Sequence, residues 1–177
     1  MLFLCTGNAA RSVMAGAALA ARLPEVRVQT AGTLVIDGLP PSTRTRTALA
    51  AVDLTAPGHR SRQAHACDLE AATVIVGLAP EHVAWVRREH RRAAARTATL
   101  KRLCRHLPAG PVPLGRRVAD LDLAEVELEP WEEVIDPGGG DTAAFVACAR
   151  EIVALVERLA ASMLDNQDTD QSIGGMR

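Results

Sequence analysis

The sequence contains no tyrosine, and only two phenylalanines and two tryptophans among its 177 residues. Lysine is almost as scarce, because Lys101 is the only one, and arginine supplies nearly all of the positive charge. No run of about 18 consecutive apolar residues is present, which excludes an ordinary transmembrane helix. No basic segment precedes an apolar stretch at the start, as a secretory signal would require. We therefore predict a cytoplasmic protein without a membrane partner.

Neither sign of charge is in excess, because 20 basic residues stand against 21 acidic ones. This balance gives no reason to expect nucleic acid as a partner. The cysteines are also few, and they are too scattered along the chain to form a disulfide framework. Reduced thiols are therefore expected at Cys5, Cys67, Cys104 and Cys148.

A chain of 177 residues that is 48% hydrophobic suffices for one folded domain. We place that domain at residues 1–164 and predict a disordered polar tail at residues 165–177. Strand patterns alternate with helical ones, so we predict an α/β fold whose four-stranded parallel sheet carries helices on both faces. Strands are expected at 1–4, 26–30, 72–77 and within 96–103, and the main helices at 11–22, 44–52, 81–92 and 142–164.

The first dozen residues combine a short apolar strand, a tight loop and an alanine-rich helix that opens at Arg11. Gly7 and Asn8 are residue types that tolerate positive φ, which suits a tight loop. A strand, a loop and a helix N-terminus in this order direct backbone N–H groups at one anion. We therefore predict a phosphate-binding loop after the first strand, made of Thr6, Gly7, Asn8, Ala9, Ala10, Arg11 and Ser12.

Cys5 stands where the first strand enters this loop. A thiol attacks as its thiolate, and a helix N-terminus with a nearby guanidinium favours that form. Arg11 can hold two oxygens of a phosphate in a bidentate fork. Ser12 is placed to hydrogen-bond the thiolate, and Asn8 can brace the loop from inside. We predict that Cys5 attacks phosphorus and forms a cysteinyl-phosphate.

Displacement by a thiolate also requires a proton for the leaving group. Asp136 is the candidate, because Pro137 biases it to an extended conformation that projects its side chain outward. An Asp-Pro-Gly sequence also fits an ordinary turn, so this assignment depends on the Cys5 loop. After donating its proton, the carboxylate can activate water against the cysteinyl-phosphate. The loop supplies the positive charge, so we expect no metal and no cofactor.

One string resembles the signature of the low-molecular-weight protein tyrosine phosphatases, a family that includes thioredoxin-coupled arsenate reductases: Cys5-x-Gly7-Asn8-x-x-Arg11-Ser12. Other segments also resemble family members and extend the similarity to about residues 1–160; they lie at 30–33, 59–62 and 134–137.

This resemblance implies a phosphatase in which Cys5 is the nucleophile, Arg11 binds phosphate and Asp136 is the general acid. Its partner would be a phosphorylated protein, with phosphotyrosine as the family default, or a small phosphate ester.

Three departures from the family concern the surroundings of the loop. Ala10 replaces a cysteine that many relatives carry before the loop arginine, so a disulfide within the loop is impossible. Glycines occupy positions 138–140, where relatives carry aromatic residues, and only Trp131 lies close in sequence to Asp136. Gly77-Leu78-Ala79 has no acidic residue after the third strand. Without aromatic walls, a phenyl ring loses the stacking surface that helps to bind it.

The main alternative is an arsenate reductase, because arsenate resembles phosphate. Thiol-coupled reduction needs further cysteines that can approach Cys5. Residues 77–86, where thioredoxin-coupled members place a redox pair, contain none. Cys67, Cys104 and Cys148 remain open as substitutes, and so does a reductase that uses an external thiol.

Two other functions have weaker support. The protein could bind an anion or a partner without turnover, although the complete set of Cys5, Arg11 and Asp136 argues against this. Zinc binding would rest on His65-x-Cys67 and Cys104-x-His106, whose one-residue spacers are unusual for zinc. The remaining histidines and the cluster of arginines are expected on solvated faces or turns, namely His59, His82, His90 and the arginines of residues 87–96.

Overall fold

The computed structural model describes residues 1–164, so the tail predicted at residues 165–177 lies outside the described residues. Its centre is one parallel sheet of four strands, β1 (Leu2–Cys5), β2 (Gln29–Gly32), β3 (Ile75–Gly77) and β4 (Thr97–Thr99). The order across the sheet is β2-β1-β3-β4. The chain adds β2 on one side of β1 and then β3 and β4 on the other, so the direction of winding reverses at β1. Ligands of such sheets bind beyond the carboxyl ends of the strands where the winding reverses. Cys5, the last residue of β1, stands at that point.

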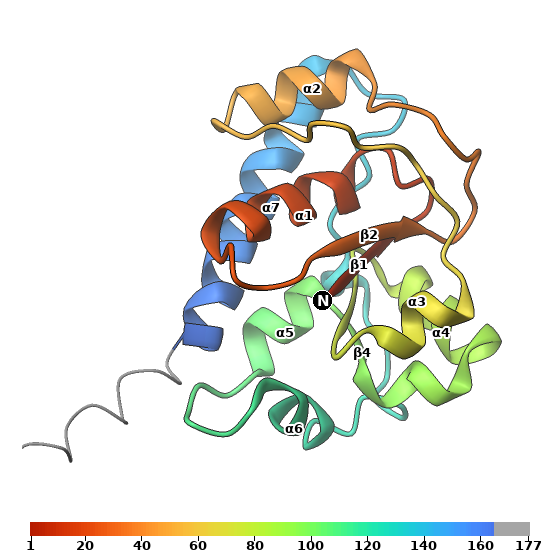
Figure 1. The fold of residues 1–177 in the computed structure, drawn as a ribbon, viewed down its shortest axis with the longest axis vertical. Coiled ribbons are helices and arrows are strands. Elements are labelled where there is room, and N and C mark those ends of the chain that lie inside the picture. The colour runs from red at the N-terminus through yellow and green to blue at the C-terminus, as the bar shows by residue number, and fades with distance from the viewer. Residues whose placement is uncertain (165–177) are drawn as a thin grey trace, which may run out of the picture.

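Helices cover both faces of the sheet, as predicted. Figure 1 shows α1, α5 and α7 on one side, and α3 and α4 on the other. The helix α7 packs against α1, α2 and α5. None of the helices in residues 1–164 combines the length and the apolar content needed to cross a membrane. Their bounds are α1 Arg11–Arg22, α2 Thr43–Ala50, α3 Ala66–Ala71, α4 Pro80–Glu89, α5 Leu100–His106, α6 Leu114–Ala119 and α7 Thr142–Leu164, with short 3₁₀ helices η1 Arg91–Arg96 and η2 Pro130–Glu132.

The strand β1 is buried on both faces and is therefore apolar at each position. Phe3 and Cys5 belong to the core cluster that includes α1 and α7, whereas Leu2 and Leu4 belong to a second cluster with residues of α3 and α4. Successive side chains of a strand point to opposite faces, so this division follows from the period of two. The burial holds the end of β1, and with it Cys5, in a fixed position.

Two predicted helices, 11–22 and 142–164, have the predicted bounds. The second strand begins at Gln29 rather than residue 26, because its pairing with β1 starts at Leu2 and Gln29. The fourth strand ends at Thr99, whose hydroxyl accepts the Arg102 N–H and caps α5. Residues 100–103 are therefore helical. The sequence pattern did not predict α6, because its residues show no clear apolar period.

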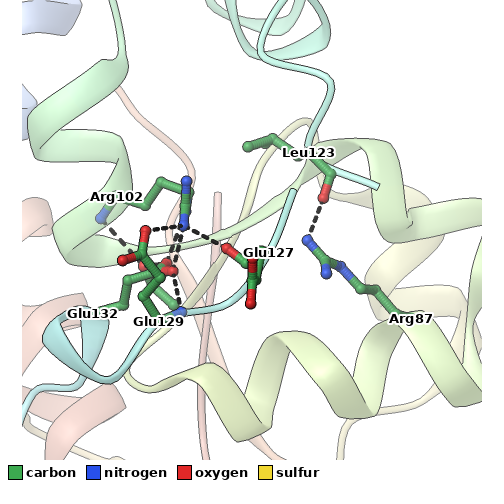
Figure 2. A network of polar contacts seen from close by, with 7 residues as sticks. Arg87, Arg102, Leu123, Glu127, Glu129 and Glu132 are labelled. Carbon is green, nitrogen blue, oxygen red and sulfur yellow. Dashed lines mark hydrogen bonds and ion pairs between the residues drawn. The ribbon is translucent and has the colours of Figure 1, made fainter. Parts of the chain in front are cut away.

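The chain that leads to the last helix is anchored by a buried ion pair (Figure 2). Arg102 donates from Nε to Oε2 of Glu132 over 2.9 Å, and Thr99 Oγ1 donates to the same oxygen over 2.6 Å. Burial alone would raise the pKa of Glu132, but the hydrogen bonds together lower it by more, so the pKa lies below its ordinary value. Arg87 was expected on a solvated face and instead donates to the Leu123 carbonyl. Together these contacts tie residues 123–132 to β4, α4 and α5.

Candidate active site

The loop between β1 and α1 presents a row of backbone donors. Within residues 1–164, the N–H groups of residues 6–10 donate to no other group. Asn8 has a φ of 49°, which turns the chain so that successive N–H groups can face one concave side. The loop runs directly into the N-terminus of α1 at Arg11. An anion is the ligand that complements this arrangement.

Contacts with residues outside the loop hold this conformation. Asn8 Oδ1 accepts the Arg62 N–H over 3.1 Å, and the Asn8 carbonyl lies 2.9 Å from His59 Nε2. His59 is therefore a brace of the loop, not the solvated turn residue that was expected. Thr45 Oγ1 donates to the carbonyl of Ala9 over 2.9 Å. These contacts direct the loop carbonyls outward and leave the N–H groups on the other side.

A close approach of β2 also shapes the loop. At Gly32, an added Cβ would lie only 2.4 Å from the Thr6 carbonyl and 2.3 Å from a methyl group of Val35. Only glycine leaves room for this approach. The next turn then donates the Leu34 N–H to the Thr6 carbonyl over 3.1 Å.

Cys5 lies at the base of the loop with only 3% of its surface exposed. Its Sγ is 3.0 Å from the hydroxyl of Ser12, so the hydrogen bond expected from the sequence is present. Asn8 Nδ2 donates to the same hydroxyl over 2.9 Å. Because the Asn8 amide occupies the hydroxyl as acceptor, the Ser12 proton is free to point at the sulfur.

The structure brings Arg11 and Asp136 together across 125 residues of chain. Arg11 Nη2 donates to Asp136 Oδ2 over 2.6 Å, and Nη1 donates to the Val134 carbonyl over 3.1 Å. The loop of Asp136 is fixed in turn, since the Val134 N–H donates to the Leu78 carbonyl. Gly138 N–H donates to Asp136 Oδ1 over 2.9 Å, which aims the carboxyl group at the phosphate-binding loop.

These groups line one open cleft of about 270 Å³. Its one aromatic residue is Phe145 of α7. Trp131, the aromatic residue close in sequence to Asp136, instead lies against the guanidinium of Arg105, 4.8 Å from the ring centroid. The lining residues are Cys5, Thr6, Gly7, Ala9, Ala10, Arg11, Ser42, Thr45, Asp136, Gly138 and Phe145.

His82 was expected on a solvated surface, but its side chain is completely buried. Its Nε2 lies 3.2 Å from Thr6 Oγ1, directly behind the phosphate-binding loop. Burial, reinforced by the nearby Arg11 guanidinium, lowers the pKa of His82 to about 3, although Asp136 acts in the opposite direction. The imidazole is therefore neutral at physiological pH. No local pattern distinguishes His82 from a surface histidine, because both its burial and its partner are set by long-range packing.

Two of the other cysteines, Cys104 and Cys148, are poorly suited to exchange with Cys5. Burial raises the pKa of Cys104 to about 11 and that of Cys148 to about 12. Both thiols are therefore protonated at neutral pH, whereas exchange requires a thiolate. Cys67 is exposed on α3, and the described residues contain no disulfide.

The sequence is similar to proteins of known family. The family model described as "Low molecular weight phosphotyrosine protein phosphatase" matches residues 1–110. A protein-arginine-phosphatase from Geobacillus stearothermophilus is 28% identical over 168 residues, which cover 94% of this chain and 97% of that protein.

Solved structures show the same fold. The YwlE arginine phosphatase from Geobacillus stearothermophilus superposes with a TM-score of 0.73 at 27% identity, over 92% of this chain and 90% of that one. A low molecular weight protein tyrosine phosphatase from T. tengcongensis gives a TM-score of 0.71 at 22% identity, over 90% of this chain and 96% of that one. At that identity the second likeness concerns the fold alone.

Proposed function

We propose that this chain hydrolyses its substrate through a covalent cysteinyl-phosphate intermediate. The chain belongs to the low molecular weight phosphotyrosine protein phosphatase family and is therefore a phosphatase. One observation supports this mechanism above all. The side chains of Cys5, Arg11 and Asp136 meet at a single cleft, which is also lined by the loop residues 6, 7, 9 and 10 with their unpaired N–H groups.

In the first step, Cys5 attacks the phosphorus atom as its thiolate, and a bond forms between Sγ and phosphorus. The bond from phosphorus to the leaving atom breaks, and that atom keeps the electron pair and takes the proton of Asp136. The loop N–H groups hold the equatorial oxygens. Arg11 must exchange its contact with Asp136 Oδ2 for two phosphate oxygens, so substrate binding opens the 2.6 Å ion pair. Once it is released from Arg11, the Asp136 carboxylate takes up from solvent the proton that it donates to the leaving atom, and it loses this proton again when the ion pair re-forms.

In the second step, the carboxylate of Asp136 removes a proton from water, and the water oxygen attacks phosphorus. The S–P bond breaks, which releases inorganic phosphate and restores the thiolate. Ser12 Oγ, 3.0 Å from Sγ, can donate to the sulfur as its negative charge returns. The protein therefore ends the cycle in the state in which it began.

For the substrate, we propose phosphoarginine in proteins. Two observations support this choice over phosphotyrosine. The relative named as a protein-arginine-phosphatase is 28% identical over nearly the whole chain. The cleft has only Phe145 to receive a ring, whereas Asp136, with 49% of its side chain exposed, can accept hydrogen bonds from a guanidinium.

Phosphotyrosine remains the second candidate, because Phe145 could form one wall for its ring. An edge or offset ring contact is worth about 0.5–1.5 kcal/mol beyond burial. Arsenate reduction that uses Cys104 or Cys148 is disfavoured, since both buried thiols are protonated at neutral pH.

The test compares two peptides of the same sequence, one with phosphoarginine and the other with phosphotyrosine. We expect kcat/KM to favour phosphoarginine by about tenfold or more, the equivalent of 1.4 kcal/mol. Equal values, or a preference for phosphotyrosine, would refute the proposed substrate but leave the mechanism intact. Activity of the Cys5→Ser variant on either peptide would refute the mechanism.

A further inference from the structure

The side chain of His82 lies behind the phosphate-binding loop and not in the cleft. His82 is in the first turn of α4, and its position depends on Gly77 at the end of β3. A Cβ at Gly77 would stand 3.1 Å from the His82 Cβ and 3.2 Å from a methyl group of Val83. The glycine therefore leaves the space in which the first turn of α4 lies against the sheet.

His82 contacts the loop at one residue, Thr6, over 3.2 Å between Nε2 and Oγ1. Thr6 follows Cys5 directly, so its N–H is the first of the unpaired donors of residues 6–10. The Thr6 carbonyl is already held by the Leu34 N–H. A second contact through the hydroxyl fixes the residue from both ends, and with it the direction of its N–H.

The charges around His82 explain why a neutral group suits this place. Arg11 and Asp136 act on the imidazole from the active site, and Glu81 Oε1 lies 3.6 Å from Nε2. A charged side chain here would compete for Arg11 or repel it. Because burial and Arg11 keep the imidazole neutral, His82 can bind Thr6 without disturbing the Arg11–Asp136 pair.

We propose that His82 is a positioning residue that acts through Thr6 Oγ1 to orient the first N–H group of the phosphate-binding loop. The proposal rests on the proposed function of that loop as the phosphate cradle. His82 touches neither substrate nor reacting atoms, since it is completely buried and does not line the cleft.

The experiment uses paired variants on both sides of the contact. His82→Gln can keep a polar nitrogen near the position of Nε2, whereas His82→Leu removes it at similar bulk. Thr6→Ser keeps the hydroxyl, and Thr6→Val removes it with almost no change of shape. Each variant is assayed for kcat, KM, inhibition by inorganic phosphate and thermal unfolding.

We expect His82→Leu and Thr6→Val each to lower kcat/KM and to raise the inhibition constant of phosphate by about tenfold, because the lost bond misdirects a loop donor. His82→Gln should stay within about threefold of the wild type, and Thr6→Ser should lose less than Thr6→Val because it keeps the hydroxyl. The double variant should lose no more than either single variant, since both remove the same contact. The pH profile of His82→Gln should coincide with that of the wild type.

Three results would overturn the proposal. Phosphate inhibition and kcat/KM could stay normal in both Thr6→Val and His82→Leu, which would show that the contact has no role. Losses could add in the double variant, which would separate the two residues. His82→Gln could lose an alkaline limb near pH 6.5, which would mean that a protonated imidazole acts in the reaction. None of these results depends on whether Cys5→Ser is inactive, so the proposed function is tested separately.

Discussion

Asp136→Asn separates proton donation from the other contacts of this side chain. Gly138 N–H donates to Asp136 Oδ1 and Arg11 donates to Oδ2, so the single amide oxygen of asparagine can keep one of these two hydrogen bonds. The transferable proton, the negative charge and the other hydrogen bond are lost. The ion pair with Arg11 is half-exposed on the Asp136 side, so its loss should cost at most about 1 kcal/mol of stability. The variant should therefore fold, and the change should appear in the kinetics.

The size of the kinetic effect depends on the leaving group. A positioned acid contributes about 10²–10⁴-fold, which corresponds to roughly 2.7–5.5 kcal/mol of barrier. This full loss is expected for alkyl phosphates, whose leaving oxygen must be protonated as it departs. An activated aryl phosphate leaves as a stable anion, so the loss in its kcat/KM should be less than about tenfold.

The assay measures kcat/KM for a series of phosphate esters that differ in the basicity of the leaving group. Asp141→Asn is the matched control, since Asp141 is a nearby exposed carboxylate whose Oδ1 accepts the Ala144 N–H at the start of α7. It should affect stability slightly and show no dependence on the leaving group. An equal loss across the series for Asp136→Asn would refute general acid catalysis and assign Asp136 to binding.

Three further perturbations test other parts of the site and the fold. Cys5→Ser should abolish turnover in a phosphate release assay while phosphate still binds in calorimetry; residual turnover at a substantial fraction of the wild-type rate would exclude Cys5 as nucleophile. Arg11→Lys should lower kcat/KM almost as severely, because an ammonium cannot form the bidentate fork, and near-normal kcat/KM would exclude the clamp. Arg102→Met leaves the carboxylate of Glu132 buried without its partner, so thermal or urea unfolding should show a loss of about 3–5 kcal/mol. A loss below about 1 kcal/mol would show that Glu132 can be rehydrated or protonated without cost.

Much of the site is local, and for that reason it could be predicted. Residues 1 to 22 themselves contain the apolar run of the strand, the glycine and asparagine that favour a tight loop and the alanines that favour a helix. The bond between Cys5 and Ser12 spans seven residues of one continuous segment, so its geometry follows once the loop and the helix are in place. The pattern of apolar residues also identified the parallel sheet and the long helix α7.

Only the tertiary structure decided which distant residues surround that loop. His82 is 76 residues from Thr6 in the chain and His59 is 51 residues from Asn8, yet each contacts the loop directly. Neither histidine lies in a sequence motif that marks it as a loop contact, because the packing between distant elements decides which histidine reaches the loop. The aromatic residue of the cleft was also unpredictable from sequence. Phe145 has the helical spacing of a core residue, and Trp131, which is closer to Asp136 in sequence, lies elsewhere. The conformational preferences of a short segment made the phosphate-binding loop predictable, whereas the residues that hold the loop are brought to it by packing between distant elements, which no short segment records.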